Sequence, residues 1–164
     1  MADEVRIESL ESSLDRLLVW IQAADTKGTI ILAMDTGMLG VLSSCVPVAS
    51  RLGFWSGAFA VVATALLVSS GIQICWVTVP RVDGPRRSMI FFGGIAEYER
   101  EEFVRCVRAR RDDEYINDLA LQIHRNGEIA KLKYRHVASA MALLQWSITP
   151  WLVGVYLLYR EGRQ

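Results

Sequence analysis

The sequence predicts an all-α, polytopic membrane protein with three transmembrane helices, of which the first and third extend into a cytoplasmic helical bundle. The 164-residue chain is 52% hydrophobic and has a formal net charge of +0. Its charged residues gather before Lys27, between Arg81 and Arg135, and at the C-terminus, and they leave long stretches nearly without charge. A helix of a soluble protein needs a polar face toward water, which these stretches cannot supply. The length suits a single domain covering residues 1–164.

Three apolar stretches match the length of a membrane-spanning helix, which needs about 20 residues. The first, residues 29–49, is apolar apart from Asp35 and a few hydroxyl groups. The second, residues 54–79, contains no ionisable group except Cys75. The third, residues 137–159, carries aromatic residues of the kind found at membrane interfaces, namely Trp146, Trp151, Tyr156 and Tyr159. A buried core helix would explain one such stretch, but it explains three poorly in so short a chain.

The Lys and Arg residues beside the spans predict the orientation, because cytoplasmic loops carry the excess of positive charge. The loop between the first two spans carries only Arg51. The segment of residues 80–136 is rich in positive charge, with Arg81, Arg86, Arg87, Arg100, Arg105, Arg108, Arg110, Arg111, Lys131, Lys133 and Arg135. We therefore expect residues 1–28 and 80–136 to be cytoplasmic and the short tail after Tyr159 to lie outside.

Both charged segments that precede a span have the alternating three- and four-residue spacing of a helical stripe. The first stripe consists of Ile7, Leu10, Leu14, Leu17, Ile21, Ala24 and Gly28. The second consists of Ile116, Ala120, Ile123, Gly127, Ala130, Tyr134, Val137 and Met141. The first stripe meets no helix breaker before its span, and the second also runs into its span, so we expect two long helices that pack along these stripes. Gly127 predicts a close helix crossing or a local break, and Pro80 and Pro85 predict a turn.

Polar residues in and beside the first span are the first features that point to a function. We expect one narrow helical face, with Asp35 at its edge, to hold Asp25, Thr29, Leu32, Thr36 and Ser43. An unpaired carboxylate in the hydrocarbon costs at least about 2.5–3.5 kcal/mol, so Asp35 should face protein or water. It can be protonated or bonded to Thr64 or Ser69, which would fix helix packing, the interpretation that the chemistry favours. The alternative is a polar seam of Thr29, Asp35, Thr36 and Ser43 that lines a pore between several copies.

No pattern in the sequence points to catalysis. His124 and His136 lack cysteine or carboxylate partners at metal-ligand spacing, and the three cysteines suggest neither a disulfide framework nor a metal site. The run at residues 92–95, FGGI, lacks the Lys and the Ser or Thr that a phosphate loop requires. A solvated helix face explains the Glu and Arg runs of residues 97–111. The sequence therefore predicts no enzyme, no metal and no cofactor.

Three blocks of the sequence resemble the Pycsar transmembrane effectors. The first is WIQAADTKG at residues 20–28, which leads into the DTG run at residues 35–37. The second is Pro80 followed by SMIFFGGIA at residues 88–96 and by Tyr98. The third is DLALQI at residues 118–123 with KLKY at residues 131–134. The blocks cover nearly the whole chain in the family's order, with one departure at Gly28, where the family is expected to prefer Ala.

This resemblance implies a role in bacterial anti-phage defence. In such systems a pyrimidine nucleotide cyclase senses infection and makes cyclic UMP or cyclic CMP. The effector binds this nucleotide and impairs the inner membrane, so that the infected cell stops growing or dies. The expected partners are the lipid bilayer, the cyclic pyrimidine nucleotide, other copies of the chain in a symmetric homo-oligomer and, functionally, the cyclase. The balanced net charge gives no reason to expect a nucleic-acid partner.

A cyclic nucleotide needs cationic donors for its phosphate, polar groups for its ribose and base edge, and a stacking surface for its base. We expect the pocket to lie near the membrane on the cytoplasmic side, between the three blocks. The phosphate candidates are Lys27, Lys131 and Lys133. Candidates for contacts to the base or ribose are Asp25, Asp118 and Gln122. The stacking candidates are Trp20, Tyr98, Tyr115 and Tyr134.

Two other functions are open at this point. Asp35 and the polar seam alone would suit a small channel or transporter that needs no ligand. The long helices would also suit a membrane-anchored scaffold that recruits a partner. Leakage of a dye from liposomes with and without cyclic pyrimidine nucleotides separates these functions from that of a ligand-gated effector.

Overall fold

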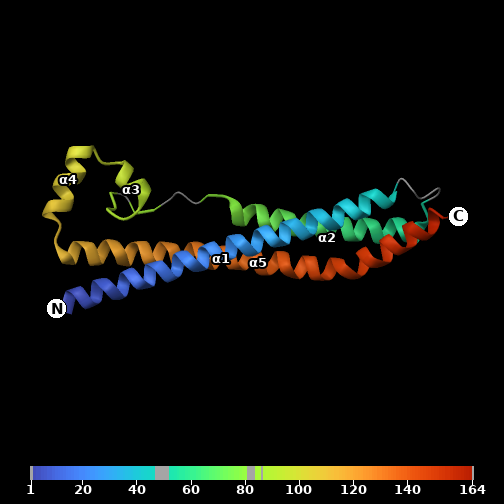
Figure 1. The fold of residues 1–164 in the computed structure, drawn as a ribbon, viewed down its shortest axis with the longest axis horizontal. Helices are drawn as coiled ribbons and strands as arrows, with labels where there is room; N and C mark the ends of the chain where they lie inside the picture. The colour runs from blue at the N-terminus through green and yellow to red at the C-terminus, as the bar shows by residue number, and fades with distance from the viewer. Residues whose placement is uncertain (1, 47–51, 81–83, 86, 164) are drawn as a thin grey trace. The chain divides into compact units, whose positions relative to one another are not determined.

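The chain is helical in a computed structural model that describes residues 2–46, 52–80, 84–85 and 87–163. The helices are α1 (Ala2–Cys45), α2 (Phe54–Thr78), α3 (Phe92–Ala96), α4 (Arg100–Ala109) and α5 (Asp112–Glu161), and no strand occurs in these ranges (Figure 1). Helices α1, α2 and α5 are each long and apolar enough to cross a membrane, which confirms the predicted count of three. Residues 47–49 of the first predicted span, Arg51, Arg81 and Arg86, and residues 81–83 of the predicted turn lie outside the described residues.

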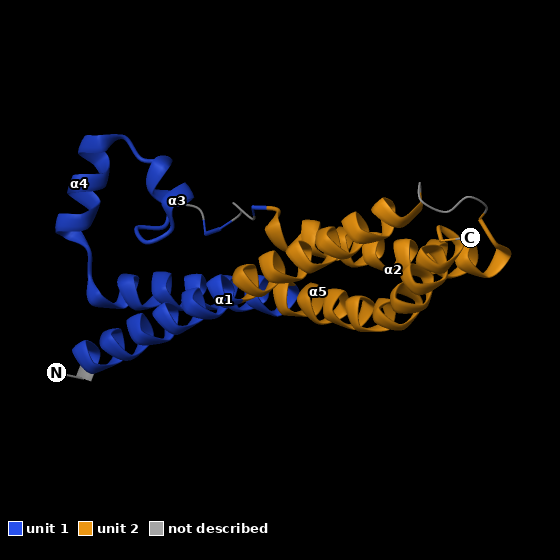
Figure 2. Cartoon of the chain, turned by 45° about the vertical axis from the view of Figure 1, so that its right-hand side comes forward, with its two compact units in different colours: residues 1–23, 80–132 blue, residues 24–79, 133–164 orange. Residues whose placement is uncertain are grey.

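Helices α1 and α5 each continue without interruption from charged into apolar sequence, as the two stripes predicted. The chain forms two compact units, and both long helices contribute to each (Figure 2). Unit 1 consists of Met1–Ala23 and Pro80–Leu132, and unit 2 consists of Ala24–Val79 and Lys133–Gln164. Unit 1 thus holds most of the charged sequence, and unit 2 holds the apolar parts of the three long helices.

Unit 2 is a three-helix arrangement whose core takes side chains from α1, α2 and α5. The main cluster contains Ala24, Ile31, Leu67, Ile74, Val77, Val137, Ala140 and Leu144. Polar contacts also link the helices. The Ser70 hydroxyl donates to the Ala140 carbonyl oxygen over 3.1 Å, and the Trp151 indole donates to the Met38 carbonyl oxygen over 2.8 Å. Such contacts help to hold helices together in lipid, where apolar burial gives little preference for helix pairing.

The beginning of α2 is held by a carboxylate from the end of α5. A Glu161 carboxylate oxygen accepts hydrogen bonds from the Gly53 backbone N–H, over 3.3 Å, and from the Ser56 hydroxyl, over 2.9 Å. The first N–H groups of a helix lack partners within the helix, and the helix dipole favours a negative charge at this end. At the other end, Val79 and Pro80 terminate α2.

The first predicted stripe is confirmed, since each of its residues is buried or partly buried. The second is wrong in detail, because Ala120 and Met141 are exposed. The buried face of α5 instead runs through Leu119, Gln122, Asn126, Ala130, Lys133, Val137, Ala140 and Leu144. Polar side chains occupy several of these buried positions, so the apolar pattern indicated a neighbouring face.

Neither alternative for Gly127 holds. Helix α5 continues through this residue, and a Cβ atom placed there would meet no described atom within 4 Å, apart from the nearby atoms of its own helix.

Candidate functional site

Unit 1 contains a cavity of about 280 Å³ that is lined by both apolar and polar or charged side chains. It is lined by Pro85, Arg87, Ser88, Met89, Arg110, Glu114, Tyr115, Asn117, Asp118 and Leu121. The residues come from the segment before α3, from the end of α4 and from the first turns of α5. We refer to this cavity as the unit 1 pocket.

One wall of the pocket is a tight turn around Ser88, whose side chain is buried. The Ser88 hydroxyl oxygen accepts the backbone N–H groups of Ile90, over 3.1 Å, and Phe91, over 2.9 Å. Arg87 precedes this turn with a φ of 54°, in the left-handed region that a non-glycine residue rarely adopts. The chain thus reverses at this point, immediately before α3.

Gly94 allows α3 to pack directly on this turn. A Cβ atom at Gly94 would lie 2.5 Å from the Ser88 backbone nitrogen and 3.0 Å from the Pro85 carbonyl oxygen. Both neighbours are backbone atoms, so neither can move aside as the end of a flexible side chain does. The FGGI run is therefore a close-packing element at the edge of the pocket. Gly94 is needed because no side chain fits between α3 and the Ser88 turn, which agrees with the absence of a phosphate-loop pattern.

Asp118 connects this turn to α5. Its Oδ2 atom accepts the backbone N–H of Met89 over 2.8 Å. The second carboxylate oxygen of a side chain in this position can still accept a bond from a ligand hydroxyl. Asp118 was predicted as a ligand contact from sequence, and the structure places it in the pocket wall.

Tyr115 lies between an acidic and a basic partner. Its hydroxyl donates to Glu11 of α1 over 2.7 Å, and the Arg110 guanidinium lies 3.6 Å from the centre of its ring. Burial, with the hydrogen bond and charge of Glu11, raises the pKa of the Tyr115 hydroxyl above its ordinary value of 10.0, while Arg110 opposes this shift. The phenol is therefore neutral at physiological pH, and its ring is held in a fixed position in the pocket wall.

The pocket also has two arginines that sequence reasoning did not select. Arg87 lies 4.9 Å from the centre of the Tyr98 ring and pairs with Glu102. Arg110 lies at the C-terminal end of α4 and reaches Tyr115 across the short connection to α5. Both were counted among the positive charges of residues 80–136, and Arg110 was also assigned to a solvated helix face. The spacing of Arg110 and Tyr115 around a helix boundary was the available signal, but it does not reveal a cavity.

The other predicted ligand residues are placed elsewhere. In unit 2, Lys133 forms an ion pair with Asp25, and the Lys27 ammonium lies 5.4 Å from the centre of the Tyr134 ring. These four residues link α1 to α5 beside the apolar stretches. In unit 1, Trp20 and Lys131 are exposed, and Tyr98 donates from its hydroxyl to the Arg87 carbonyl oxygen.

Gln122, another of the predicted ligand residues, does not line the unit 1 pocket. It is buried on α5, and its side-chain oxygen has no hydrogen-bond partner among the described residues.

The structure divides the predicted polar seam of the first span into two sets. Thr29, Thr36 and Ser43 are exposed, and their hydroxyls donate to carbonyl oxygens of α1 itself. Asp35 is only 2% exposed, so it faces protein, as expected, and is separated from the exposed set. The reason is its position in the core spacing of α1, where it follows the buried residues Gly28 and Ile31.

The partners expected for Asp35, however, are wrong. Ser69 donates to the Ala65 carbonyl oxygen, and Thr64 is exposed. The polar neighbour of Asp35 is Ser70, one residue further along α2. The Ser70 hydroxyl donates to α5, and neither carboxylate oxygen of Asp35 has a hydrogen bond of normal geometry to any described residue. Unit 2 thus contains a buried, unsatisfied carboxyl group in its membrane-spanning part.

Comparison with known proteins agrees with the resemblance seen in the sequence. The model of the PycTM family, described as the Pycsar effector protein domain, matches residues 9–160. Comparisons with curated proteins and with solved structures each gave no match. The match includes the unit 1 pocket, the Asp25–Lys133 pair and the three apolar helices. The chain therefore belongs to the PycTM family of Pycsar effector proteins, which act in anti-phage defence.

Proposed function

We propose that this chain binds a cyclic pyrimidine mononucleotide, cyclic UMP or cyclic CMP, in the unit 1 pocket and responds by impairing the bacterial inner membrane. The observation that carries the proposal is the pocket itself, which combines two guanidinium groups, an aromatic ring, an amide and two carboxylates around about 280 Å³. This volume is close to the lower end for small-molecule sites, as expected for a mononucleotide.

The phosphate of the ligand has a natural place near Arg87 and Arg110. A cyclic phosphodiester carries one negative charge, and a guanidinium can give it two parallel, charge-assisted hydrogen bonds. Arg87 is already paired with Glu102, and Arg110 is in contact with Tyr115. We propose that phosphate binding competes with these contacts, so that the ligand changes the position of both arginines.

The base and ribose have complementary groups in the same wall. The Tyr115 ring offers a stacking surface, and the Asn117 amide has both a donor and an acceptor for the polar edge of a pyrimidine. Glu114 and Asp118 can accept hydrogen bonds from a ribose hydroxyl. A pyrimidine is the smaller of the two classes of base, which suits a cavity of this size.

The coupling to the membrane is proposed to run through α5. This helix carries Tyr115 and Asp118 in its first turns and continues without a break into its apolar part. A ligand shifts the protein toward a second conformation only as far as it binds that conformation more tightly. In this proposal the second conformation opens the packing around Asp35. Within a homo-oligomer, it brings polar groups of neighbouring copies into contact inside the membrane.

Calorimetric titration of the purified protein with cyclic UMP and cyclic CMP tests the location of the site. Loss of one charge-assisted contact in Arg110→Ala or Arg87→Ala should weaken binding by roughly tenfold or more. Arg108→Ala, which removes an exposed arginine of α4 that does not line the pocket, is the matched control. Unchanged affinity in both pocket variants would exclude this site.

The same titration on Lys27→Ala and Lys133→Ala tests the site predicted from sequence. A loss of affinity in these two variants, with none in the arginine variants, would move the ligand to the Asp25–Lys133 region. The alternatives of a ligand-independent channel and of a scaffold have different outcomes when the release of a dye from liposomes is measured with and without nucleotide.

A further inference from the structure

Helix α5 carries a second stripe of coiled-coil spacing on the side opposite its buried face. The stripe consists of Ala138, Ala142, Gln145, Thr149, Leu152 and Tyr156, and all six residues are exposed in the single chain. Their separations alternate between four and three residues, which is the spacing of a seam that packs against another helix. The buried positions of the same helix, Val137, Ala140, Leu144 and Ser147, follow the same rhythm and are covered by α1 and α2. We refer to the exposed set as the outer seam.

The outer seam carries polar side chains in the middle of the membrane-spanning part of α5, where lipid offers no hydrogen-bond partner. With a rise of 1.5 Å per residue, Gln145 lies about 15 Å along the helix from Arg135 and about 22 Å from Arg160. The hydrocarbon core of a bilayer is about 30 Å thick, so Gln145 lies deep within it. Its amide, like the Trp146 indole and the Thr149 hydroxyl, has no hydrogen bond within the described part of the chain.

Pro150 removes one backbone hydrogen bond from the same turn. Proline has no backbone N–H, so it cannot donate to the carbonyl oxygen of Trp146, four residues earlier in the helix. Polar groups in the hydrocarbon are costly unless they are paired, and a lipid chain cannot pair with them. An exposed apolar face would be satisfied by lipid, whereas this one requires a protein partner.

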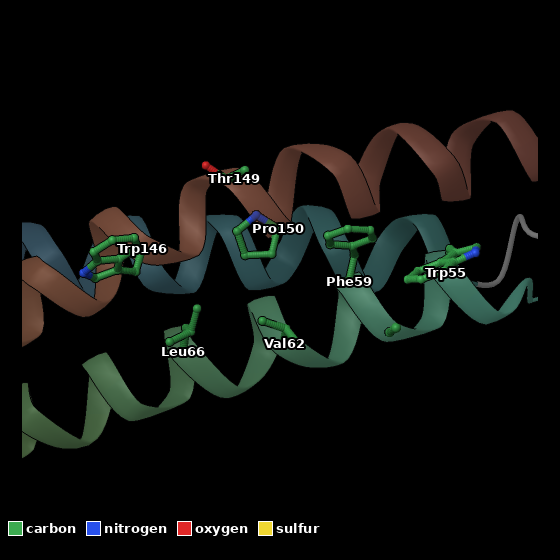
Figure 3. Close-up of a pocket in the computed structure, with 8 residues that line it drawn as sticks. Trp55, Phe59, Val62, Leu66, Trp146, Thr149 and Pro150 are labelled. Atoms are coloured by element: carbon green, nitrogen blue, oxygen red, sulfur yellow. The ribbon is translucent and has the colours of Figure 1, made fainter.

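The surface beside the seam is hollowed. Trp146, Thr149 and Pro150 form one side of a cavity of about 710 Å³, and Trp55, Phe59, Val62 and Leu66 of α2 are on the other side (Figure 3). Trp146 is 75% exposed, although its ring is one of the largest apolar surfaces on the helix. The outer seam, through Thr149, and this cavity thus form a continuous surface on one side of unit 2.

We propose that the outer seam pairs with the outer seam of a second copy of this chain, with Gln145 opposite Gln145. All copies inserted in one membrane share the same orientation, so a symmetry axis along the membrane normal places each residue at the depth of its equivalent. A primary amide has both donors and an acceptor, so two glutamines at equal depth satisfy one another. Ala138 and Ala142 are small enough to let the two helices approach. The inference extends the homo-oligomer of the proposed function, and it requires neither ligand binding nor leakage.

Disulfide trapping in native membranes without nucleotide tests this pairing. In a background in which Cys45, Cys75 and Cys106 are replaced by Ala, the outer seam variant Gln145→Cys should form a covalent dimer on oxidation. The matched control is Ile148→Cys, at nearly the same depth and also exposed, but outside the seam. We expect at least a tenfold higher dimer yield for Gln145→Cys than for Ile148→Cys. Equal yields, or no dimer from either, would overturn the proposal.

A second measurement keeps the test independent of cysteine chemistry. Gln145→Leu removes the amide and keeps the approximate size, so self-association measured by energy transfer between labelled copies in liposomes should weaken by roughly three- to tenfold. Ile148→Leu should leave it unchanged. Unchanged association in Gln145→Leu would overturn the proposed glutamine pair. Since no nucleotide is present, these results leave the calorimetric test of the proposed function unaffected, and the reverse also holds.

Discussion

Lys133 of α5 and Asp25 of α1 form an ion pair in which the lysine side chain is only 11% exposed and the aspartate side chain is 43% exposed. This difference in exposure matters because, if the pair is broken, Asp25 can contact water more easily than Lys133 can. A buried ammonium without its carboxylate has no replacement for the lost contact, whereas the aspartate can be hydrated. The pair therefore holds α1 to α5 beside the apolar stretches mainly because the buried Lys133 ammonium would be costly without its carboxylate partner.

The two single variants of this pair should differ in stability. Asp25→Ala should lower the free energy of unfolding by about 1–3 kcal/mol, less than for a fully buried pair because water screens Asp25. Lys133→Met, which keeps the length of the side chain, should cost less. Thermal unfolding in detergent measures both, and the double variant should recover part of the loss seen in Asp25→Ala. Equal losses in the two single variants would contradict the asymmetry.

Gly94→Ala should damage the unit 1 pocket. The added methyl group would lie 2.5 Å from the Ser88 backbone nitrogen, so α3 and the Ser88 turn must separate. We expect nucleotide affinity in calorimetry to fall by roughly tenfold or more, with little change in helix content by circular dichroism.

Gly127→Ala is the control for Gly94→Ala. It introduces the same methyl group in the same unit, where no neighbouring atom lies within 4 Å. It should leave affinity unchanged and raise stability by up to about 1 kcal/mol, because Ala favours the helix. Equal affinities in the two variants would show that the Gly94 contact is irrelevant to the pocket.

Replacing Asp35 by an apolar residue should stabilise the resting protein. The Asp35 carboxyl group is buried without a hydrogen bond of normal geometry, and burial of such a polar group costs about 1–3 kcal/mol in proteins. Asp35→Leu should therefore raise the unfolding temperature and reduce nucleotide-dependent leakage. Thr36 is exposed, and its hydroxyl donates to a carbonyl oxygen of its own helix, so Thr36→Ala should change both quantities little. A loss of stability in Asp35→Leu would indicate a structural role for the carboxyl group.

The Tyr115 hydroxyl should lose its proton at a higher pH than an ordinary tyrosine does, because its pKa is raised. Its raised pKa means that the folded protein keeps this proton above pH 10, where an unfolded chain releases it. The corresponding contribution to stability is present below pH 10 and is lost as the pH rises through the higher, folded pKa. Ultraviolet titration should show a phenolate component above pH 10 that is missing in Tyr115→Phe. A component that is complete below pH 10 would contradict the contact with Glu11.

The sequence was sufficient to predict the three apolar helices, because a bilayer requires long uncharged segments. It also predicted the α1 stripe, whose members are apolar from Ile7 to Ala24. The buried face of α5 was misplaced since Gln122, Asn126 and Lys133 occupy core positions, and a polar residue there looks like a surface residue. The burial of Asp35 agrees with the expectation that it faces protein, but Thr64 and Ser69 were expected as its neighbours in place of Ser70.

The unit 1 pocket was predicted only in part. Tyr115 and Asp118 were selected by their chemistry, but the pocket depends on the left-handed conformation of Arg87 and on the contact of Gly94 with Ser88. These are tertiary features that no periodicity indicates. The departure at Gly28 has no steric cause, since a Cβ atom there would lie 3.6 Å from Ile74 and Val77, an ordinary contact distance. Ala, which the family resemblance led us to expect, thus fits at this position.

The most direct test of the central claim is the release of a dye from liposomes that contain the purified protein. We predict release after addition of cyclic UMP or cyclic CMP, none without nucleotide, and a strongly reduced response in Arg110→Ala but not in Arg108→Ala. Equal release with and without nucleotide would indicate a ligand-independent channel. No release in either condition would favour a scaffold, and either result would contradict the proposed nucleotide-gated effector.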